Sequence, residues 1–375
     1  MIEGILLGVL IANLIMAAYA GLKLRYGLTH FKMKRLMSEP SMLRDMPTVS
    51  VCVPARNEMA VMSECLEKLL ASKYPKLEII VFDDSSADNT STLIKAFAHE
   101  GIRFVEGSPL PEGWLGKNHA LQELLRQASG DYILFMDVDT RLGADTIEEL
   151  MAYCLQEKAA MISVLPRRED GWRWSVIFGT LRYFWEIIFH RQSSPAVASN
   201  AWMIEQEALV ALGGFESIKA MVQPEARLSA QLMAENKYRF LIGTSLLGVT
   251  YEKKWRSQAA TSIRLLFPLL GGRIYLSVLG VFALLVLLMP FAAFVDGFFM
   301  GWSIIQAISG AVLMIFVILY GIFLRQTRAH TWWLGALLWP LTLMQEIVLL
   351  ITSTERYLRH DVTWKGRSIT HEKEQ

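Results

Sequence analysis

The stretch GDYILFMDVDT, residues 130–140, decides how the middle of this chain folds. Tyr132–Met136 is an apolar run of strand length, and the acidic pair Asp137 and Asp139 follows it directly. A short apolar run of this kind predicts a strand that is buried on both faces. Two carboxylates at its end repel each other unless a cation or hydrogen-bond donors hold them. Such oxygen ligands suit Mg²⁺ or Mn²⁺, with substrate phosphates completing the shell, and the alternative is a turn with one helix-capping Asp.

Similar apolar runs recur on both sides of this stretch. They are Thr48–Val53, Leu77–Phe82, Ile102–Val105 and Met161–Leu165. Between the first two, Val61, Cys65, Leu66 and Leu69 fall on one face of a helix. The alternation of strands and helices predicts an α/β fold in which a mostly parallel sheet lies between helices. Ligands of such sheets bind beyond the carboxyl ends of the strands.

Polar residues follow three of these strands at the point where each strand ends. Residues 54–58 (PARNE) come after the strand Thr48–Val53, and residues 83–90 (DDSSADNT) come after the strand Leu77–Phe82. Asp137 and Asp139 come after the strand Tyr132–Met136. One acidic turn of this kind is common at helix caps. Three of them on one sheet edge indicate a binding site for a cation and a polar substrate.

This ordered set of motifs resembles that of inverting glycosyltransferases of family 2, which have the GT-A fold, and the resemblance covers roughly residues 47–250. It implies a metal-dependent glycosyltransferase of the hexosyltransferase class that uses Mg²⁺ or Mn²⁺. The donor that it implies is a nucleotide-diphosphosugar, and we expect a UDP-sugar.

A second element, PLPEGWLGKNHA at residues 109–120, is similar to the LPxGWxGKxxA element of bacterial carotenoid- and hopanoid-associated membrane glycosyltransferases. Gly116 and Lys117 can place backbone N–H groups and one cation near an anion, and the alternative is a loop whose Trp114 packs on the sheet. The WKGR sequence at residues 364–367 resembles the ending of the same proteins. Together, the resemblance assigns nucleotide-sugar binding to Pro54, Arg56, Glu58, Asp83, Asp84, Gly116, Lys117 and Asp137, and the metal to Asp137 and Asp139.

The catalytic base is where this chain departs from the family pattern. Family members carry a Gly-Gly turn and then a Glu-Asp pair whose Asp is the base; here Gly213-Gly214 is followed by Pro224-Glu225. The resemblance therefore implies Glu225 as the base, one methylene longer than Asp, with Glu216 as the fallback. If neither acts, this copy is a catalytically impaired nucleotide-binding scaffold. On the acceptor side we place Asn200, Trp202, Gln223, Arg227 and Trp255.

The apolar residues concentrate at the two ends of the chain. Of its 375 residues 53% are hydrophobic and 19% are charged, so an ordinary soluble globule is excluded. Lys and Arg flank the spans and mark the cytoplasmic side. We expect a transmembrane anchor (1–24), a basic juxtamembrane linker (25–46), a cytoplasmic GT-A domain (47–256), an interfacial helix (257–273), C-terminal membrane helices (274–354) and a basic tail (355–375).

The number of spans in the C-terminal membrane region decides on which side of the membrane the basic tail lies. Asp296-Gly297 reads as a turn between two spans, 274–295 and 299–324, and a last apolar block contains Pro340, Gln345 and Glu346. A fourth full span would leave the basic tail outside, so we expect this block to be re-entrant or interfacial. The aromatic and basic stretch 172–191 suits a membrane interface or ordinary core packing equally.

Several classes of protein are excluded or disfavoured. The formal net charge of +1 argues against a nucleic-acid binder. Three cysteines without short spacing argue against a disulfide framework or zinc site, and few polar residues in the spans argue against a transporter. We expect a multi-pass enzyme of the cell membrane that moves a sugar to a lipid-like acceptor, isoprenoid or other, at the cytoplasmic leaflet. The alternative acceptors are a polyprenyl phosphate or a glycan.

Overall fold

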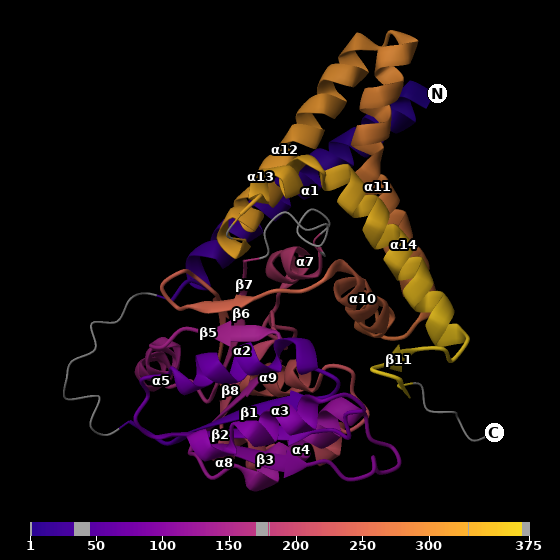
Figure 1. Cartoon of the computed structure of the whole chain (residues 1–375). Coiled ribbons are helices and arrows are strands. Elements are labelled where there is room, and N and C mark those ends of the chain that lie inside the picture. The colour runs from indigo at the N-terminus through magenta and orange to yellow at the C-terminus, as the bar shows by residue number, and fades with distance from the viewer. Residues whose placement is uncertain (1, 34–45, 170–178, 180, 329, 370–375) are drawn as a thin grey trace. The chain divides into compact units, whose positions relative to one another are not determined.

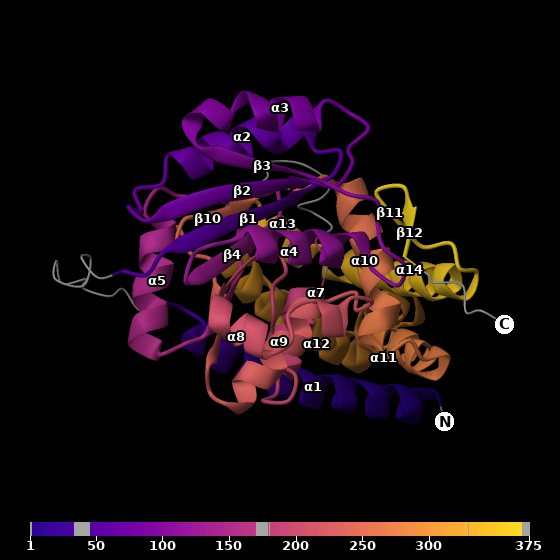
Figure 2. The same cartoon turned by 90° about the horizontal axis from the view of Figure 1, so that it is seen from below.

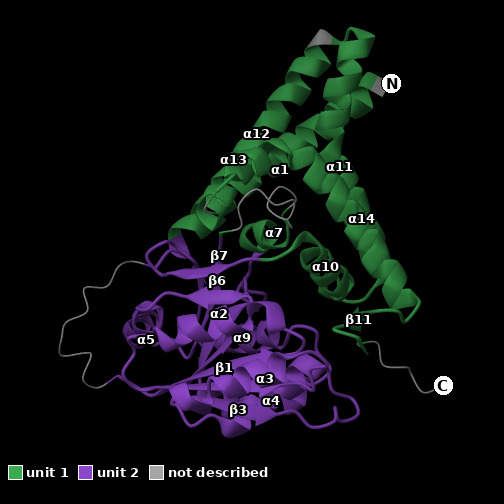
Figure 3. Ribbon diagram, in the orientation of Figure 1, with its two compact units in different colours: residues 1–29, 169–189, 253–375 green, residues 30–168, 190–252 purple. Residues whose placement is uncertain are grey.

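The computed structural model describes residues 2–33, 46–169, 179, 181–328 and 330–369. The chain divides into two compact units (Figure 3). The sheet unit comprises residues 30–168 and 190–252, and the helical unit comprises residues 1–29, 169–189 and 253–375. Residues 169–189 thus interrupt the sheet unit in sequence and group with the helices.

A seven-stranded sheet with the order β3-β2-β1-β4-β8-β6-β9 forms the centre of the sheet unit (Figures 1 and 2). Its neighbours pair in parallel except β8, which is antiparallel to both β4 and β6. The predicted mostly parallel α/β sheet is confirmed, and the five predicted strands end within two residues of the observed bounds. The strands are β1 (Val49–Ala55), β2 (Leu77–Asp83), β3 (Ile102–Glu106), β4 (Tyr132–Met136), β6 (Met161–Leu165), β8 (Ala201–Glu205) and β9 (Tyr238–Ile242).

Helices cover both faces of this sheet. Side chains alternate along a strand, so Val49, Val51 and Val53 of β1 point into one core together with apolar residues of α2 and α5. On the opposite face, Phe135 of β4 packs against Phe215. The helices of the sheet unit are α2 (Met59–Leu70), α3 (Thr90–Ala96), α4 (Gly116–Gln127), α5 (Thr146–Glu157), α8 (Gln206–Ala211) and α9 (Pro224–Ala234), with the 3₁₀ turns η1 (Ala98–Glu100) and η2 (Glu216–Ile218).

A small second sheet, which the sequence analysis did not predict, begins directly after the acidic pair. It has the order β5-β10-β7, formed by Thr140–Leu142, Val249–Tyr251 and Arg167–Arg168. β5 pairs antiparallel with β10. Residues 137–139 are therefore a tight connection between two strands that belong to different sheets.

The helical unit contains α1 (Ile2–His30), α7 (Arg182–Phe189), α10 (Trp255–Leu269), α11 (Ile274–Met300), α12 (Ser303–Thr327), α13 (Trp332–Leu337), α14 (Trp339–Leu358) and the hairpin β11–β12 (Thr363–Trp364 and Arg367–Ser368). Within the described part of the chain, three helices are long and apolar enough to cross a membrane: Glu3–His30, Ile274–Met300 and Ile304–Thr327. α1 continues past the expected end of the anchor at residue 24, so the first residues of the basic linker are helical.

The turn predicted at Asp296-Gly297 is wrong. α11 continues through both residues to Met300, and the chain reverses at Gly301, whose φ of 70° is left-handed. Gly297 has a packing role instead, because a Cβ there would lie 2.8 Å from Cβ of Gln306 on α12. A single Asp-Gly pair does not end an apolar helix whose hydrogen bonds are all internal.

The last apolar block forms two helices that fold back on the preceding ones. α13 packs along α12, and α14 packs along α10 and α11. In Figure 1 they form a bent pair, and the ends of α12 and α14 lie at the same end of the helical unit, opposite the α11–α12 turn. Whether this pair is re-entrant in a bilayer stays a prediction.

The aromatic stretch 172–191 is partly within the described residues. Trp172 and Trp174 lie outside them. Phe184 is fully buried and its ring contacts Tyr320 and Trp339, while Trp185 also contacts Trp339. For these two residues the packing interpretation fits the structure.

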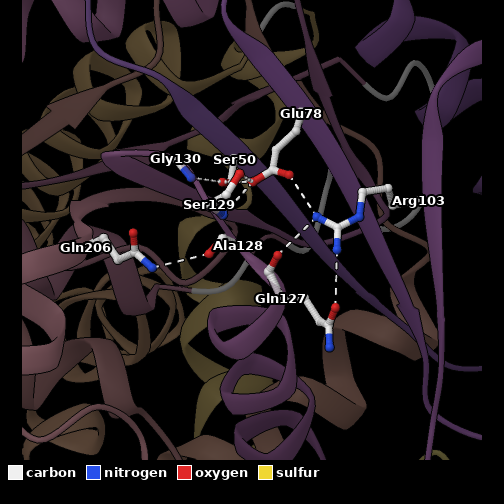
Figure 4. A network of polar contacts seen from close by, with 8 residues as sticks. All are labelled: Ser50, Glu78, Arg103, Gln127, Ala128, Ser129, Gly130 and Gln206. Atoms are coloured by element: carbon white, nitrogen blue, oxygen red, sulfur yellow. Dashed lines mark hydrogen bonds and ion pairs between the residues drawn. The ribbon is translucent and has the colours of Figure 1, made fainter.

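A polar network joins the first strands of the large sheet at their amino ends (Figure 4). Oε1 of Glu78 accepts hydrogen bonds from Ser50 Oγ at 2.5 Å and from the Ser129 N–H at 2.6 Å. Its Oε2 is 2.9 Å from Nη1 of Arg103, which also donates to the Gln127 carbonyl at 3.0 Å. One carboxylate thus connects β1, β2, β3 and the end of α4.

This network makes the stability of the sheet unit depend on pH. Burial raises the pKa of Glu78, but hydrogen bonds from Ser50, Ser129 and Arg103 outweigh it and hold the pKa below the ordinary value of 4.5. The stabilisation is present above that value and is lost as the pH falls through the lower, folded-state pKa. We expect Glu78→Gln to lower stability at neutral pH by about 1–2 kcal/mol.

Thermal melting of the purified protein at several pH values tests this expectation. The difference in melting temperature between the wild type and Glu78→Gln should narrow as the pH falls below 4.5. Glu67→Gln, on the exposed face of α2, is the matched control and should melt like the wild type. A difference that stays constant down to acidic pH would show that the Glu78 charge is not what stabilises the network.

Candidate functional site

The loops that follow β1 and β2 bind each other at the carboxyl edge of the sheet. The Asn57 N–H donates to Ser86 Oγ at 2.9 Å, and the Ala87 N–H donates back to Asn57 Oδ1 at 2.8 Å. The Glu58 N–H donates to Thr90 Oγ1 at 2.8 Å. Two loops that lie about thirty residues apart in the sequence therefore act as one rigid wall.

Arg56 lies inside this wall. Its Nη1 donates to the carbonyls of Asp84 and Ser85 and lies 4.0 Å from Asp84 Oδ2. Asp83 and Asp84 are both buried. The structure thus brings together Arg56, Glu58, Asp83 and Asp84, as predicted, and gives Arg56 a role in holding the second loop. Pro54 lies within β1, one residue before its end.

The first turn of α4 carries a cation toward the acidic pair. α4 begins at Gly116, and Nζ of Lys117 lies 2.7 Å from Oδ1 of Asp137. The Asp137 N–H donates to the Asn200 carbonyl at 2.9 Å, and Thr140 Oγ1 donates to the same carbonyl at 3.2 Å. Asn200, which we placed on the acceptor side, therefore holds the acidic turn in place.

Arg141 is a site residue that the sequence analysis missed. Its Nη1 donates to the carbonyls of Val138 at 2.6 Å and Thr140 at 3.1 Å, and its Nη2 lies 2.9 Å from Oε2 of Glu64 on α2. The hydrogen bond from Arg141 holds the pKa of Glu64 below its ordinary value. The acidic turn is thereby tied to the helix that follows β1.

Asn118 is the second missed residue, and it joins the first turn of α4 to the segment before α9. Its side chain, 1% exposed, has Nδ2 within hydrogen-bond distance of three carbonyls: Ile218 at 3.1 Å, Lys219 at 2.9 Å and Met221 at 2.8 Å. The partners lie about a hundred residues away in the sequence, so no local pattern could have revealed them. This contact fixes the chain four residues before Glu225.

Glu225 and Glu216, the two candidate bases, have different surroundings. Glu225 lies in the first turn of α9 and is 2% exposed, and no hydrogen bond or ion pair of its carboxylate to another described residue is present. The side chain of Glu216 is 61% exposed and pairs with Lys219 at 3.2 Å. A buried carboxylate without a partner is costly, which favours Glu225 as the functional group.

The remaining acceptor-side residues divide into three groups. Gln223 and Arg227 flank Glu225 at the start of α9. Trp202 is a correction: it is 1% exposed and packs against Phe135 and Phe215, which leaves it no surface for an acceptor. Trp255 begins α10 in the helical unit, where its Nε1 donates to Gln345 Oε1 at 2.9 Å.

The acidic pair fits a hard divalent cation. Within the described residues, no group of three or more His, Cys, Asp or Glu side chains is arranged to hold a metal. Two carboxylates after a buried strand, Asp137 and Asp139, are the donor set that suits Mg²⁺ or Mn²⁺ when phosphate oxygens and water supply the other ligands. The metal and the phosphates would then bind together.

The chain is similar to known glycosyltransferases in sequence and in fold. Residues 50–209 match the model of the family described as Glycosyl transferase family 2. The chain is 34% identical over 117 residues to the probable glycosyltransferase YdaM of Bacillus subtilis, which covers 30% of this chain and 26% of that protein. It is 32% identical over 112 residues to the poly-beta-1,6-N-acetyl-D-glucosamine synthase of Staphylococcus epidermidis, covering 30% and 26%.

The similarity to curated relatives is therefore partial, since the chain spans between about a quarter and a half of their length. One solved structure resembles the chain over almost its full length. It is the mannosyltransferase PcManGT from Pyrobaculum calidifontis in complex with GDP-Man and Mn²⁺, with a TM-score of 0.56, 19% identity and coverage of 94% of this chain and 99% of that one. At this identity the likeness establishes the fold.

The Asn118 contact generates a prediction. In Asn118→Asp the carboxylate would face three carbonyls and donate to none, at a cost of about 1–3 kcal/mol. We expect faster amide hydrogen exchange in residues 216–223, measured by mass spectrometry, while β1 and β4 stay protected. Gln156→Glu makes the same chemical change on the exposed face of α5 and should leave the exchange unaltered. Unchanged exchange in Asn118→Asp would show that this segment is held by other contacts.

Proposed function

We propose that this chain is a membrane-bound inverting enzyme. The premise is that it contains a glycosyltransferase domain of family 2 at residues 50–209. It moves a sugar from a nucleotide-diphosphosugar, expected to be a UDP-sugar, to a lipid-like acceptor at the cytoplasmic leaflet of the cell membrane. The observation that carries the proposal is the pairing of an acidic turn and a lysine on one sheet edge, in a chain with three candidate membrane spans.

The donor would bind at the carboxyl edge of the sheet. Its nucleotide would lie against the wall formed by Arg56, Glu58, Asp83 and Asp84, and its diphosphate near Gly116 and Lys117. Asp137 and Asp139 would hold Mg²⁺ or Mn²⁺, and when bound, the metal neutralises the leaving diphosphate. The N-terminal end of α4 favours anions at the same place.

The transfer itself requires one proton acceptor. The acceptor hydroxyl attacks the anomeric carbon in line with the leaving diphosphate, the new C–O bond forms, and the old bond breaks with inversion. The carboxylate of Glu225 takes the hydroxyl proton, and Lys117 stabilises the negative charge on the released nucleoside diphosphate. Burial and the lack of a competing partner among the described residues support Glu225 over Glu216.

The lipid-like acceptor is inferred from the helical unit. A chain with three candidate spans keeps its catalytic domain at a bilayer surface, where membrane-dissolved acceptors are concentrated. A glycan acceptor is the second candidate, favoured by the similarity to a poly-beta-1,6-N-acetyl-D-glucosamine synthase. Product mass after incubation with a labelled nucleotide-sugar and a membrane extract separates the two.

Glu225→Gln tests both the reaction and its base. We expect turnover, measured as sugar-dependent release of nucleoside diphosphate, to fall by about a hundredfold or more, while binding of the nucleotide with Mn²⁺ persists. Glu216→Gln is the matched control and should retain most of the activity. Full activity in Glu225→Gln would exclude it as the base, and a wild type that binds nucleotide but never turns over would favour the scaffold alternative.

The proposed orientation gives a separate prediction. Basic residues flank the ends of α1, α12 and α14, which indicates the cytoplasmic side, and the native cysteines are all buried. A cysteine introduced at exposed Phe299, near the α11–α12 turn, should react with a membrane-impermeant maleimide in intact cells. One introduced at exposed Thr363 should react only after permeabilisation. The reverse pattern would place the catalytic domain outside.

A further inference from the structure

Lys117 and Asp137 form an ion pair in which each side chain is the other's one polar partner among the described residues. Nζ and Oδ1 lie 2.7 Å apart, and the side chains are 19% and 29% exposed. Among the described residues, neither side chain makes another hydrogen bond or ion pair. The pair is therefore a closed unit at the place where the proposed metal and diphosphate would bind.

The two cations near the acidic turn differ in their freedom to move. Arg141 is anchored through its guanidinium to the carbonyls of Val138 and Thr140 and to Glu64, so moving it would break several contacts at once. The ammonium of Lys117 has one hydrogen-bond and ion-pair partner among the described residues, which is Asp137. It lies at the end of a flexible four-carbon side chain and can re-orient at little cost. Of Lys117 and Arg141, the lysine is the one that can leave the turn without breaking the contacts that shape the loop.

A divalent cation on Asp137 would displace that lysine. An ammonium and a divalent cation held by one carboxylate would lie close together and repel each other, so Asp137 would hold Lys117 less tightly once it held the metal. A lysine so displaced is uncompensated unless an anion is near, and the anion available at the start of α4 is the diphosphate of the donor.

We infer that Lys117 is a placeholder cation: it occupies Asp137 until the donor arrives, and then turns to the diphosphate as the metal takes its place. This inference rests on the proposed function and deepens it. It makes the metal and the nucleotide bind cooperatively, because each removes the obstacle to the other, and such coupling is reciprocal. The metal alone would be held weakly, because the ammonium on the same carboxylate repels it.

The test is a pair of binding measurements on the purified full-length protein, without any turnover. Mn²⁺ binding is followed by the electron paramagnetic resonance signal of the free ion, first without nucleotide. UDP and GDP binding is then measured by calorimetry with Mn²⁺ present. In Lys117→Gln we expect Mn²⁺ alone to bind about fivefold tighter, because the competing ammonium is gone. We expect the nucleoside diphosphates to bind about fivefold or more weakly, because their counter-cation is gone.

These opposite signs separate the placeholder role from a structural one. Lys117→Arg keeps the charge and should not gain Mn²⁺ affinity, and Lys68→Gln, on the exposed face of α2, should match the wild type in both measurements. Lys117→Met keeps the aliphatic stem and serves if the glutamine variant melts early. The inference is overturned if Mn²⁺ affinity in the neutral variants is unchanged or falls. If the wild type itself shows no Mn²⁺-dependent nucleotide binding, the proposed function fails instead.

Discussion

The carboxylates gathered at one edge of the sheet impose the constraint on which this site depends. Parallel strands bring the buried Asp84 and the partly buried Asp137 to the same edge, where a nearby cation offsets the loss of solvent around each carboxylate. Arg56 lies near Asp84, and Lys117 lies 2.7 Å from Asp137. The arginine also donates to backbone carbonyls, so charge compensation and loop shape are one feature. A metal and a diphosphate that bind together could replace an existing ion pair where each side chain has one partner, as in the pair of Lys117 and Asp137.

The antiparallel strand β8 connects this edge of the sheet to the other half of the domain. It pairs with β4 along its length, from Tyr132 opposite Glu205 to Met136 opposite Ala201. Asn200, one residue before β8, is thereby placed to accept the Asp137 N–H, and Trp202 is carried into the core. Asn118 makes the second connection, from α4 to the segment that leads to Glu225. The carboxyl edge of the sheet is thus joined to β8 through Asn200 and to the segment before Glu225 through Asn118.

Sequence patterns predicted the parts of the fold in which burial alone decides the structure. Tyr132–Met136 and Met161–Leu165 are almost wholly apolar, with Ser163 the exception in the second, and their observed bounds equal the predicted ones. β5, β7 and β10 have two or three residues each and carry Arg or Thr, so they have no periodicity to read. Asn118 escaped because its partners lie about a hundred residues away, and Arg141 escaped because its link to Glu64 joins segments that are distant in the sequence. Asp296-Gly297 misled because a turn signal is weak inside a helix that satisfies its own backbone.

Polar residues among the apolar ones explain why the sequence of α14 does not resemble an ordinary membrane span. Its buried face holds the polar residues Thr342, Glu346 and Ser353, and Leu341, Met344, Val348 and Ile351 form an exposed stripe on its outer side. Glu346 accepts the Leu181 N–H at 2.8 Å, and Ser353 Oγ accepts the Phe267 N–H at 3.0 Å. The buried face is mixed, because Trp339, Leu343, Leu349 and Leu350 lie on it beside these polar residues. An exposed apolar stripe of this kind suits contact with lipid. Three crossings followed by a bent pair would also return the basic tail to the side where the linker begins, as its charge favours.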